Sequence, residues 1–164
     1  RTEPRAVHAS LPLAAPRAAP REQAVNLDGV RALVVDDDED SRHLTRAVLE
    51  GLGARVGEAS SVPAAIDAMR QEWPEVLLAD IGMPGEDGYS LIGWVRRIER
   101  QSASRLPALA LTAYARSADR ERALAAGFDE YLSKPASPTD VAQAVGRLTG
   151  RTTGYERENV KGKM

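Results

Sequence analysis

The chain has no cysteine and few aromatic residues. Its 164 residues include two histidines, two tryptophans, four tyrosines and one phenylalanine. Without cysteine, neither a disulfide framework nor a thiolate metal site can form, and the distant pair His8 and His43 does not favour a zinc site. Because 43% of the residues are hydrophobic and only 4% are aromatic, the core must be aliphatic.

Long apolar runs and a strong net charge are also missing. No run approaches the length that spans a bilayer and no signal peptide is visible, so we expect a cytoplasmic segment without membrane contact. The formal charge is −2, and no strongly basic stretch occurs in the folded region, which argues against direct binding of nucleic acid. The length suits one domain of ordinary size.

Composition divides the chain into three parts. Residues 1–28 are rich in Ala and Pro, with Pro12, Pro16 and Pro20 closely spaced, and this composition predicts an extended linker. Residues 29–149 carry the alternating apolar segments of a folded domain. Residues 150–164 have little apolar content, which predicts a flexible tail.

Five apolar segments are predicted to be strands, and each is followed by a helix. Four of the strands end on polar residues: 32–35 on Asp36 and Asp37, 76–79 on Asp80, 108–111 on Thr112, and 131–133 on Lys134. The other strand, 54–58, is expected at or near an edge. The first helix, 39–51, is expected to place Leu44, Val48 and Leu49 on one face, and the third, 88–100, to place Leu91, Ile92, Val95 and Ile98 on one face.

Strands that alternate with helices predict a parallel sheet with helices on both faces. The usual five-stranded solution is the flavodoxin-like order 2-1-3-4-5, so we expect an α/β, three-layer (βα)5 fold. In that order the first and third strands are neighbours, which brings Asp36, Asp37 and Asp80 to one edge of the sheet. Thr112 and Lys134 follow on the other side of the third strand.

The clustered acids predict a cation site. Neighbouring carboxylates repel one another unless a cation lies between them, and oxygen ligands without His or Cys favour Mg²⁺, with Mn²⁺ as an alternative. Lys134 can contact a phosphate oxygen or Asp80, and the hydroxyl of Thr112 can donate to a phosphate oxygen. Asp80 is then a candidate nucleophile that forms an aspartyl phosphate.

A flavin carrier is the alternative within the same fold. It needs a loop rich in hydroxyl groups and glycine after the first strand to hold the phosphate of the cofactor. Here that loop is the acidic segment Asp36–Asp40, which would repel a phosphate unless a metal intervened, and aromatic residues to sandwich a flavin are scarce.

Four motifs resemble those of the receiver domain of two-component signalling proteins, across roughly Val30–Leu148. They are Leu33–Asp38, Leu78–Gly88, Ala110–Ala113 and Lys134–Pro135. Each motif is weak by itself, but the four in this order, at the ends of the predicted strands, are specific. The resemblance implies a phosphoacceptor domain that takes a phosphoryl group from a phosphohistidine donor, with Mg²⁺ as its cofactor.

The resemblance also implies a role for each matching residue. The phosphoacceptor position is Asp80, and the metal positions are Asp36, Asp37, Asp80 and the backbone carbonyl of Gly82. The switch hydroxyl is Thr112, the switch aromatic is Tyr131, and the lysine that contacts the phosphoryl group is Lys134. Activation would then alter the face built from the fourth and fifth helices and the strand between them.

The wider context is also an expectation by resemblance. Leu11–Ala14 and the Ala/Pro segment resemble the end of a histidine kinase ATP-binding domain, and no output domain follows, so we expect the C-terminal receiver of a hybrid sensor histidine kinase. The fragment itself is expected to be no enzyme beyond Mg²⁺-dependent self-phosphorylation and dephosphorylation, and to be a monomer or weak dimer. A stand-alone response regulator and a phosphorylation-independent interaction module remain the alternatives.

Overall fold

The computed structural model describes residues 24–83, 85–113 and 116–153. The described strands are β1 (Ala24–Val25), β2 (Arg31–Val35), β3 (Arg55–Ala59), β4 (Val76–Asp80), β5 (Ala108–Thr112), β6 (Glu130–Ser133) and β7 (Thr152–Thr153). The described helices are α1 (Glu39–Gly51), α2 (Val62–Gln71), α3 (Gly88–Glu99), α4 (Ser117–Ala126) and α5 (Pro138–Thr149). Among these residues, no helix is long and apolar enough to cross a membrane.

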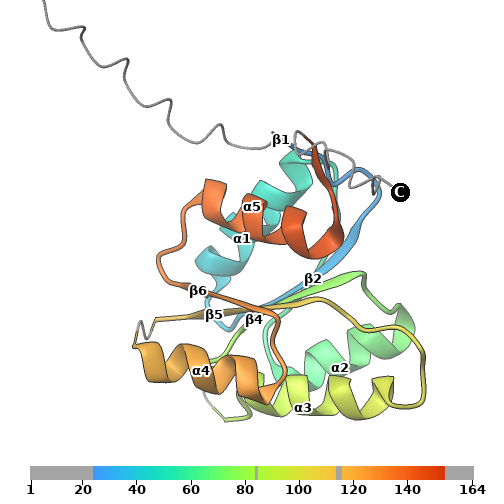
Figure 1. Ribbon diagram of the computed structural model, residues 1–164, viewed down its shortest axis with the longest axis vertical. Helices are drawn as coiled ribbons and strands as arrows, with labels where there is room; N and C mark the ends of the chain where they lie inside the picture. Colours follow the sequence, from blue (N-terminus) through green and yellow to red (C-terminus); the bar gives the residue numbers. More distant parts are fainter. Residues whose placement is uncertain (1–23, 84, 114–115, 154–164) are drawn as a thin grey trace, which may run out of the picture.

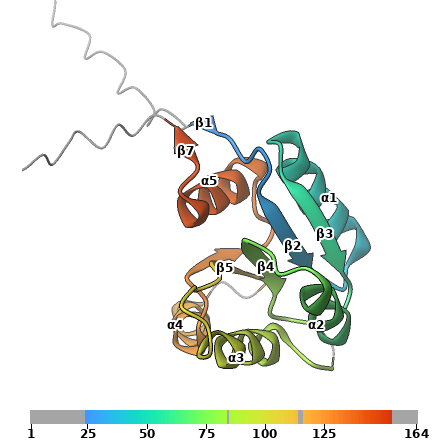
Figure 2. The same ribbon diagram turned by 90° about the vertical axis from the view of Figure 1, so that its right-hand side faces the viewer.

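The central sheet has five parallel strands in the order β3-β2-β4-β5-β6. Counted from β2, the first strand of this sheet, the order is 2-1-3-4-5, so the predicted fold is confirmed. The strand expected near an edge, β3, is the edge strand next to β2. Helices α1 and α5 cover one face of the sheet, and α2, α3 and α4 cover the other (Figure 1; Figure 2 shows the layers after a quarter turn).

Alternation within the central strands divides the core into two layers. Leu77 and Ala79 of β4 pack toward α2, α3 and α4, whereas Val76 and Leu78 pack toward α1 and α5. All four side chains are fully buried, as period-two alternation requires when helices cover both faces of a sheet. The core contains Phe128 as its one fully enclosed aromatic ring among the described residues, which agrees with the predicted aliphatic core.

Local caps fix where the helices begin. Asp38 accepts hydrogen bonds from the backbone N–H groups of Asp40 and Ser41 and so caps α1. The side chain of Ser61 caps α2 by accepting from Ala64. Capping of α1 by Asp38 holds the loop after β2 against the first turn of the helix, which positions the preceding acidic residues.

Ordered elements occur on both sides of residues 29–149, the range expected for the folded domain. β1 pairs with β7 in a short antiparallel ladder, and Leu27 is fully buried in the core layer under α1 and α5. This small sheet packs on α5, where Gly146 leaves room for Val25 and Thr152. The pairing joins the two ends of the domain, so no local pattern in either segment could reveal it. Residues 1–23 and 154–164, the remainder of the expected linker and tail, lie outside the described residues.

Two helix faces also differ from the predicted pattern. Leu44 is 58% exposed and Ile98 is 45% exposed, although each was assigned to the apolar face of its helix. Helix α1 buries Leu49 of that face together with Thr45. The apolar period was identified correctly, but the stripe reached one residue too far around each helix.

Candidate functional site

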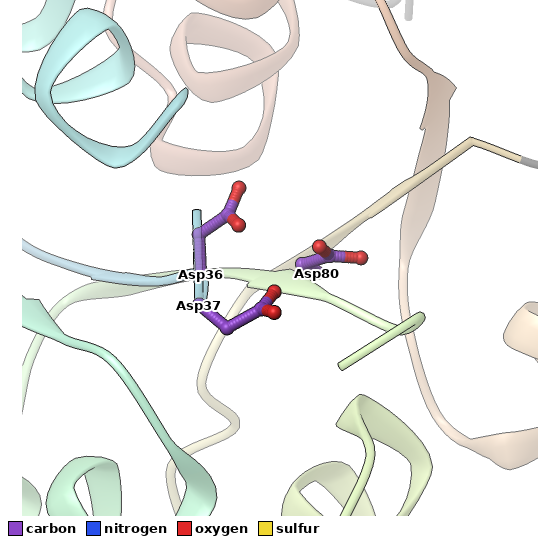
Figure 3. Close-up of side chains that lie close together, drawn as sticks. All are labelled: Asp36, Asp37 and Asp80. Carbon is purple, nitrogen blue, oxygen red and sulfur yellow. The ribbon is translucent and has the colours of Figure 1, made fainter. Parts of the chain in front are cut away.

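The predicted site residues meet at the carboxyl ends of the parallel strands. Asp36 and Asp37 follow β2, Asp80 ends β4, Thr112 ends β5, and Lys134 follows β6. One carboxylate oxygen from each of Asp36, Asp37 and Asp80 lies within 4.8 Å of the others. Figure 3 shows that the side chains of Asp36 and Asp37 diverge from the end of β2, with that of Asp80 beside them.

Asp80 is a buried carboxylate with two hydrogen-bond donors. Its Oδ1 accepts from the backbone N–H of Gly82 at 2.8 Å, and its Oδ2 accepts from Lys134 Nζ at 3.1 Å. Burial raises the pKa of Asp80 above its usual value, and these two donors offset only part of that effect. A carboxylate with a raised pKa is more basic, and therefore a better nucleophile, than one exposed to water.

Asp36 and Asp37 occupy different environments although they are adjacent. The Asp36 side chain is 1% exposed, its Oδ2 accepts from Lys134 Nζ at 2.6 Å, and its Oδ1 accepts from the backbone N–H of Asp38 at 3.0 Å. Asp37 is exposed. A cation in this site would thus have one carboxylate from the interior and one from the solvent side.

Lys134 joins the two buried acids. Burial by itself lowers the pKa of Lys134, but the hydrogen bonds to Asp36 and Asp80 outweigh it, so the pKa lies above its usual value and the ammonium stays charged. The backbone N–H of Lys134 donates to the carbonyl of Thr112 at 2.6 Å. The side chain therefore has a fixed origin at the end of β6 and reaches across β5 to β4.

Thr112 and Tyr131 lie on neighbouring strands and share one face of the sheet. Thr112 is fully buried and pairs with Ser133 in the ladder, and Tyr131 is two residues before Ser133. Tyr131 is half-buried and packs against the core layer under α2, α3 and α4, and this burial raises the pKa of its phenol. The structure thus brings Asp36, Asp37, Asp80 and Lys134 into one cluster, and Thr112 and Tyr131 lie on the two strands that follow β4 in the sheet order.

Gly88 belongs to the site although the sequence indicated it only as part of a motif. A Cβ atom on Gly88 would lie 2.8 Å from the backbone oxygen of Asp80 and 2.9 Å from the Cα of Ile81. Helix α3 therefore begins in direct contact with the end of β4. Arg42, which belongs to none of the four motifs, donates from Nη1 to the backbone oxygen of Asp36 at 2.8 Å. Its position six residues after Asp36, on the first helix, was the one available signal.

The donor set fits a small, hard cation. Mg²⁺ prefers oxygen ligands at about 2.1 Å in octahedral geometry, which separates ligand oxygens by about 3–4 Å. The three carboxylates are close to that separation, and the donors are all oxygens, which suits Mg²⁺ or Mn²⁺ rather than zinc. Asp36, Asp37 and Asp80 are therefore the side chains that can hold the metal.

Comparison with known proteins identifies the family. The model of the response regulator receiver domain matches residues 32–146. The chain belongs to the receiver domain family. This assignment removes the flavin-carrier alternative, and the fold and the acidic cluster are those the resemblance implied.

Related receiver domains occur in proteins of different architecture. The chain is 46% identical over 113 residues to an uncharacterized 14.6 kDa protein of Leptolyngbya boryana, covering 69% of this chain and 85% of that protein. It is 38% identical over 133 residues to the sensor protein GacS of Pseudomonas syringae pv. syringae, covering 79% of this chain but 15% of GacS. A crystal structure called a response regulator, from Chloroflexus aurantiacus J-10-fl, is 31% identical with a TM-score of 0.69, covering 76% of this chain and 100% of that one.

Proposed function

We propose that this receiver domain accepts a phosphoryl group on Asp80 from a phosphohistidine donor. The observation that carries the proposal is the position of Asp80, whose buried carboxylate lies at the end of the central strand within 3.1 Å of Lys134 and beside two further acids. A carboxylate oxygen of Asp80 forms a bond to phosphorus, the bond between phosphorus and the histidine nitrogen breaks, and the imidazole leaves with that electron pair.

The chain's own residues prepare this transfer. The N–H of Gly82 and the ammonium of Lys134 each hold one oxygen of Asp80, which orients the carboxylate toward the incoming group. Lys134 also offsets negative charge on the transferred phosphoryl group. Asp36, Asp37 and Asp80, with the backbone carbonyl of Gly82, would hold Mg²⁺, which would supply further positive charge near the transferred phosphoryl group.

Phosphorylation is then proposed to shift the equilibrium between two conformations of the domain. The hydroxyl of Thr112 would form a hydrogen bond to an oxygen of the new phosphoryl group. Tyr131, on the same face of the sheet, would change rotamer when Thr112 moves. The surface affected is formed by α4, β6 and α5, because Tyr131 lies on β6 between these helices. Such a switch selects one of two arrangements that already exist.

We propose that the chain is the receiver domain of a hybrid sensor histidine kinase and lies in the cytoplasm. Similarity to GacS supports it, although the chain spans 15% of that protein. The Leptolyngbya boryana relative, of which the chain covers 85%, favours a stand-alone response regulator as the second candidate. A kinase dimerisation domain or a histidine phosphotransfer protein would be the donor in either case.

Intact mass after incubation with acetyl phosphate tests the chemistry. Wild-type protein should gain one phosphoryl group in the presence of Mg²⁺ and none after chelation, and Asp80→Asn should gain none. Asp67→Asn, which changes an exposed acid on α2, should behave as wild type. An adduct that persists in Asp80→Asn would refute the assignment of the acceptor.

A binding and transfer experiment with a candidate partner distinguishes a phosphoacceptor domain from a phosphorylation-independent interaction module. If a candidate phosphohistidine protein binds wild type and Asp80→Asn equally and transfers no phosphoryl group to either, the acidic site has no role in signalling. Transfer from that protein to wild type alone supports the phosphoacceptor function.

A further inference from the structure

The loop that carries Asp36 and Asp37 is held by the side chain of one arginine, Arg42. Arg42 lies on the first turns of α1 with 14% of its side chain exposed, and its Nη1 donates to the backbone oxygen of Asp36 at 2.8 Å. The backbone N–H of the same residue, Asp36, donates to the carbonyl of Ala59 on β3 at 3.1 Å. Both backbone polar groups of Asp36 are therefore fixed by neighbouring elements.

This contact determines the direction of Asp37. The peptide unit is planar, so anchoring the carbonyl of Asp36 also fixes the N–H of Asp37 and the plane from which its side chain departs. Asp37 is exposed, which means that packing does little to hold it. The position of its carboxylate relative to Asp80 thus depends on the backbone that Arg42 holds.

Arg42 also forms an ion pair with Glu58 on the edge strand. Its Nε lies 3.5 Å from Glu58 Oε1, and the Glu58 side chain is 17% exposed. The other oxygen of Glu58 pairs with Arg46 at 2.7 Å, which keeps the carboxylate in place. In the ladder Glu58 precedes Ala59, the residue that bonds the N–H of Asp36, so β3 supports the acidic loop at two consecutive residues.

We propose that Arg42, through its hydrogen bond to the Asp36 carbonyl, is a positioning residue for the metal site, and that it raises Mg²⁺ affinity by fixing the Asp36–Asp37 peptide. This inference rests on the proposed function, since it requires that the acids bind the metal. Arg42 contacts no carboxylate of the acidic cluster in the structure as described, so its action runs through the backbone.

The charge of Arg42 and its hydrogen bond to Asp36 predict opposite effects on Mg²⁺ affinity when Arg42 is replaced. A guanidinium close to a cation site repels the cation, so loss of its charge alone should tighten Mg²⁺ binding. Loss of its hydrogen bond to Asp36 should weaken binding, because the acids are no longer held for the metal. The sign of the change in affinity therefore separates the two roles.

Isothermal titration of the metal-free protein with Mg²⁺ alone provides the test. Arg42→Met is expected to raise the Kd by about tenfold, the lower end of what loss of a supporting contact around a metal site costs. Arg42→Lys, which keeps the charge and one donor, should recover part of the loss, and Glu58→Gln should raise the Kd by a smaller factor. Urea unfolding without metal establishes that each variant is folded.

Arg70→Met is the control. It removes one positive charge from an exposed position in the last turn of α2, outside the network formed by Arg42, Glu58 and Arg46. Its Kd should stay within about twofold of wild type. If Arg42→Met binds Mg²⁺ as tightly as wild type or more tightly, the positioning role is overturned while the proposed function stands. If wild type binds no Mg²⁺, both are overturned.

Discussion

Adding one methyl group at Gly88 should disturb both stability and phosphorylation. The new Cβ would lie 2.8 Å from the backbone oxygen of Asp80 and 2.9 Å from both Cα and Cγ2 of Ile81, whereas ordinary contacts begin near 3.4 Å. The start of α3 and the end of β4 would have to separate by about 0.5–0.6 Å. Gly88 does not have a positive φ, so the cost comes from space alone.

The expected magnitude follows from two opposing effects. Overpacking of a tight contact costs about 1–3 kcal/mol, and Ala exceeds Gly in helix propensity by about 1 kcal/mol in a helix interior, less at the first residue. Gly88→Ala should therefore lower the free energy of unfolding by about 1–2 kcal/mol. Displacement of Asp80 by half an ångström should slow phosphorylation by acetyl phosphate about tenfold.

Gly93 on the same helix offers the control. A Cβ there meets nothing within 4 Å, so Gly93→Ala should stabilise the protein by about 0.5–1 kcal/mol and leave the phosphorylation rate unchanged. Urea unfolding and the time course of intact mass measure both quantities. If Gly88→Ala is as stable as Gly93→Ala and is phosphorylated at the wild-type rate, the close packing of α3 on Asp80 does not constrain the site.

Two further substitutions test the electrostatics of the fold. Because burial raises the pKa of Asp80 above its value in the unfolded chain, its ionised form destabilises the fold. Without Mg²⁺ at pH 7, Asp80→Asn should therefore unfold at a higher urea concentration than wild type. The difference between the two midpoints should shrink as the pH falls through the pKa of Asp80 in the folded protein. A difference that stays constant with pH would contradict this explanation. Arg96, 13% exposed, donates to the carbonyl of Gly127 and pairs with Glu99, which is 9% exposed. Arg96→Met should cost about 3 kcal/mol of unfolding free energy and the exposed Arg97→Met about none; equal losses would refute the burial argument.

The order of elements and the proximity of the acidic residues could be predicted because both depend on local patterns. Short apolar runs that alternate with amphipathic helices identify the strands of a parallel sheet. The carboxyl ends of parallel strands lie at the same edge of that sheet. Asp36, Asp80, Thr112 and Lys134 each come directly after such a run, so the topology alone brings them together. Their proximity needed no knowledge of side-chain packing.

Local patterns did not show how far each helix is rotated or that β1 pairs with β7. Helical period shows which residues share a face but fixes the rotation of the helix only to within about one residue. Leu44 and Ile98 were therefore assigned to the apolar faces of their helices although both are exposed. The pairing of β1 with β7 joins segments at opposite ends of the domain, and two residues in each strand give no pattern to detect.

The sequence by itself thus determined the sheet, its order and the acids at its edge, because these depend on the spacing of residue types along the chain. Tertiary structure alone decided what surrounds them: that Gly88 must be small because α3 begins against Asp80, and that Arg42 lies where it can hold the carbonyl of Asp36. Such contacts depend on distances of a few tenths of an ångström between separate elements, and these are set by the packing of the whole core.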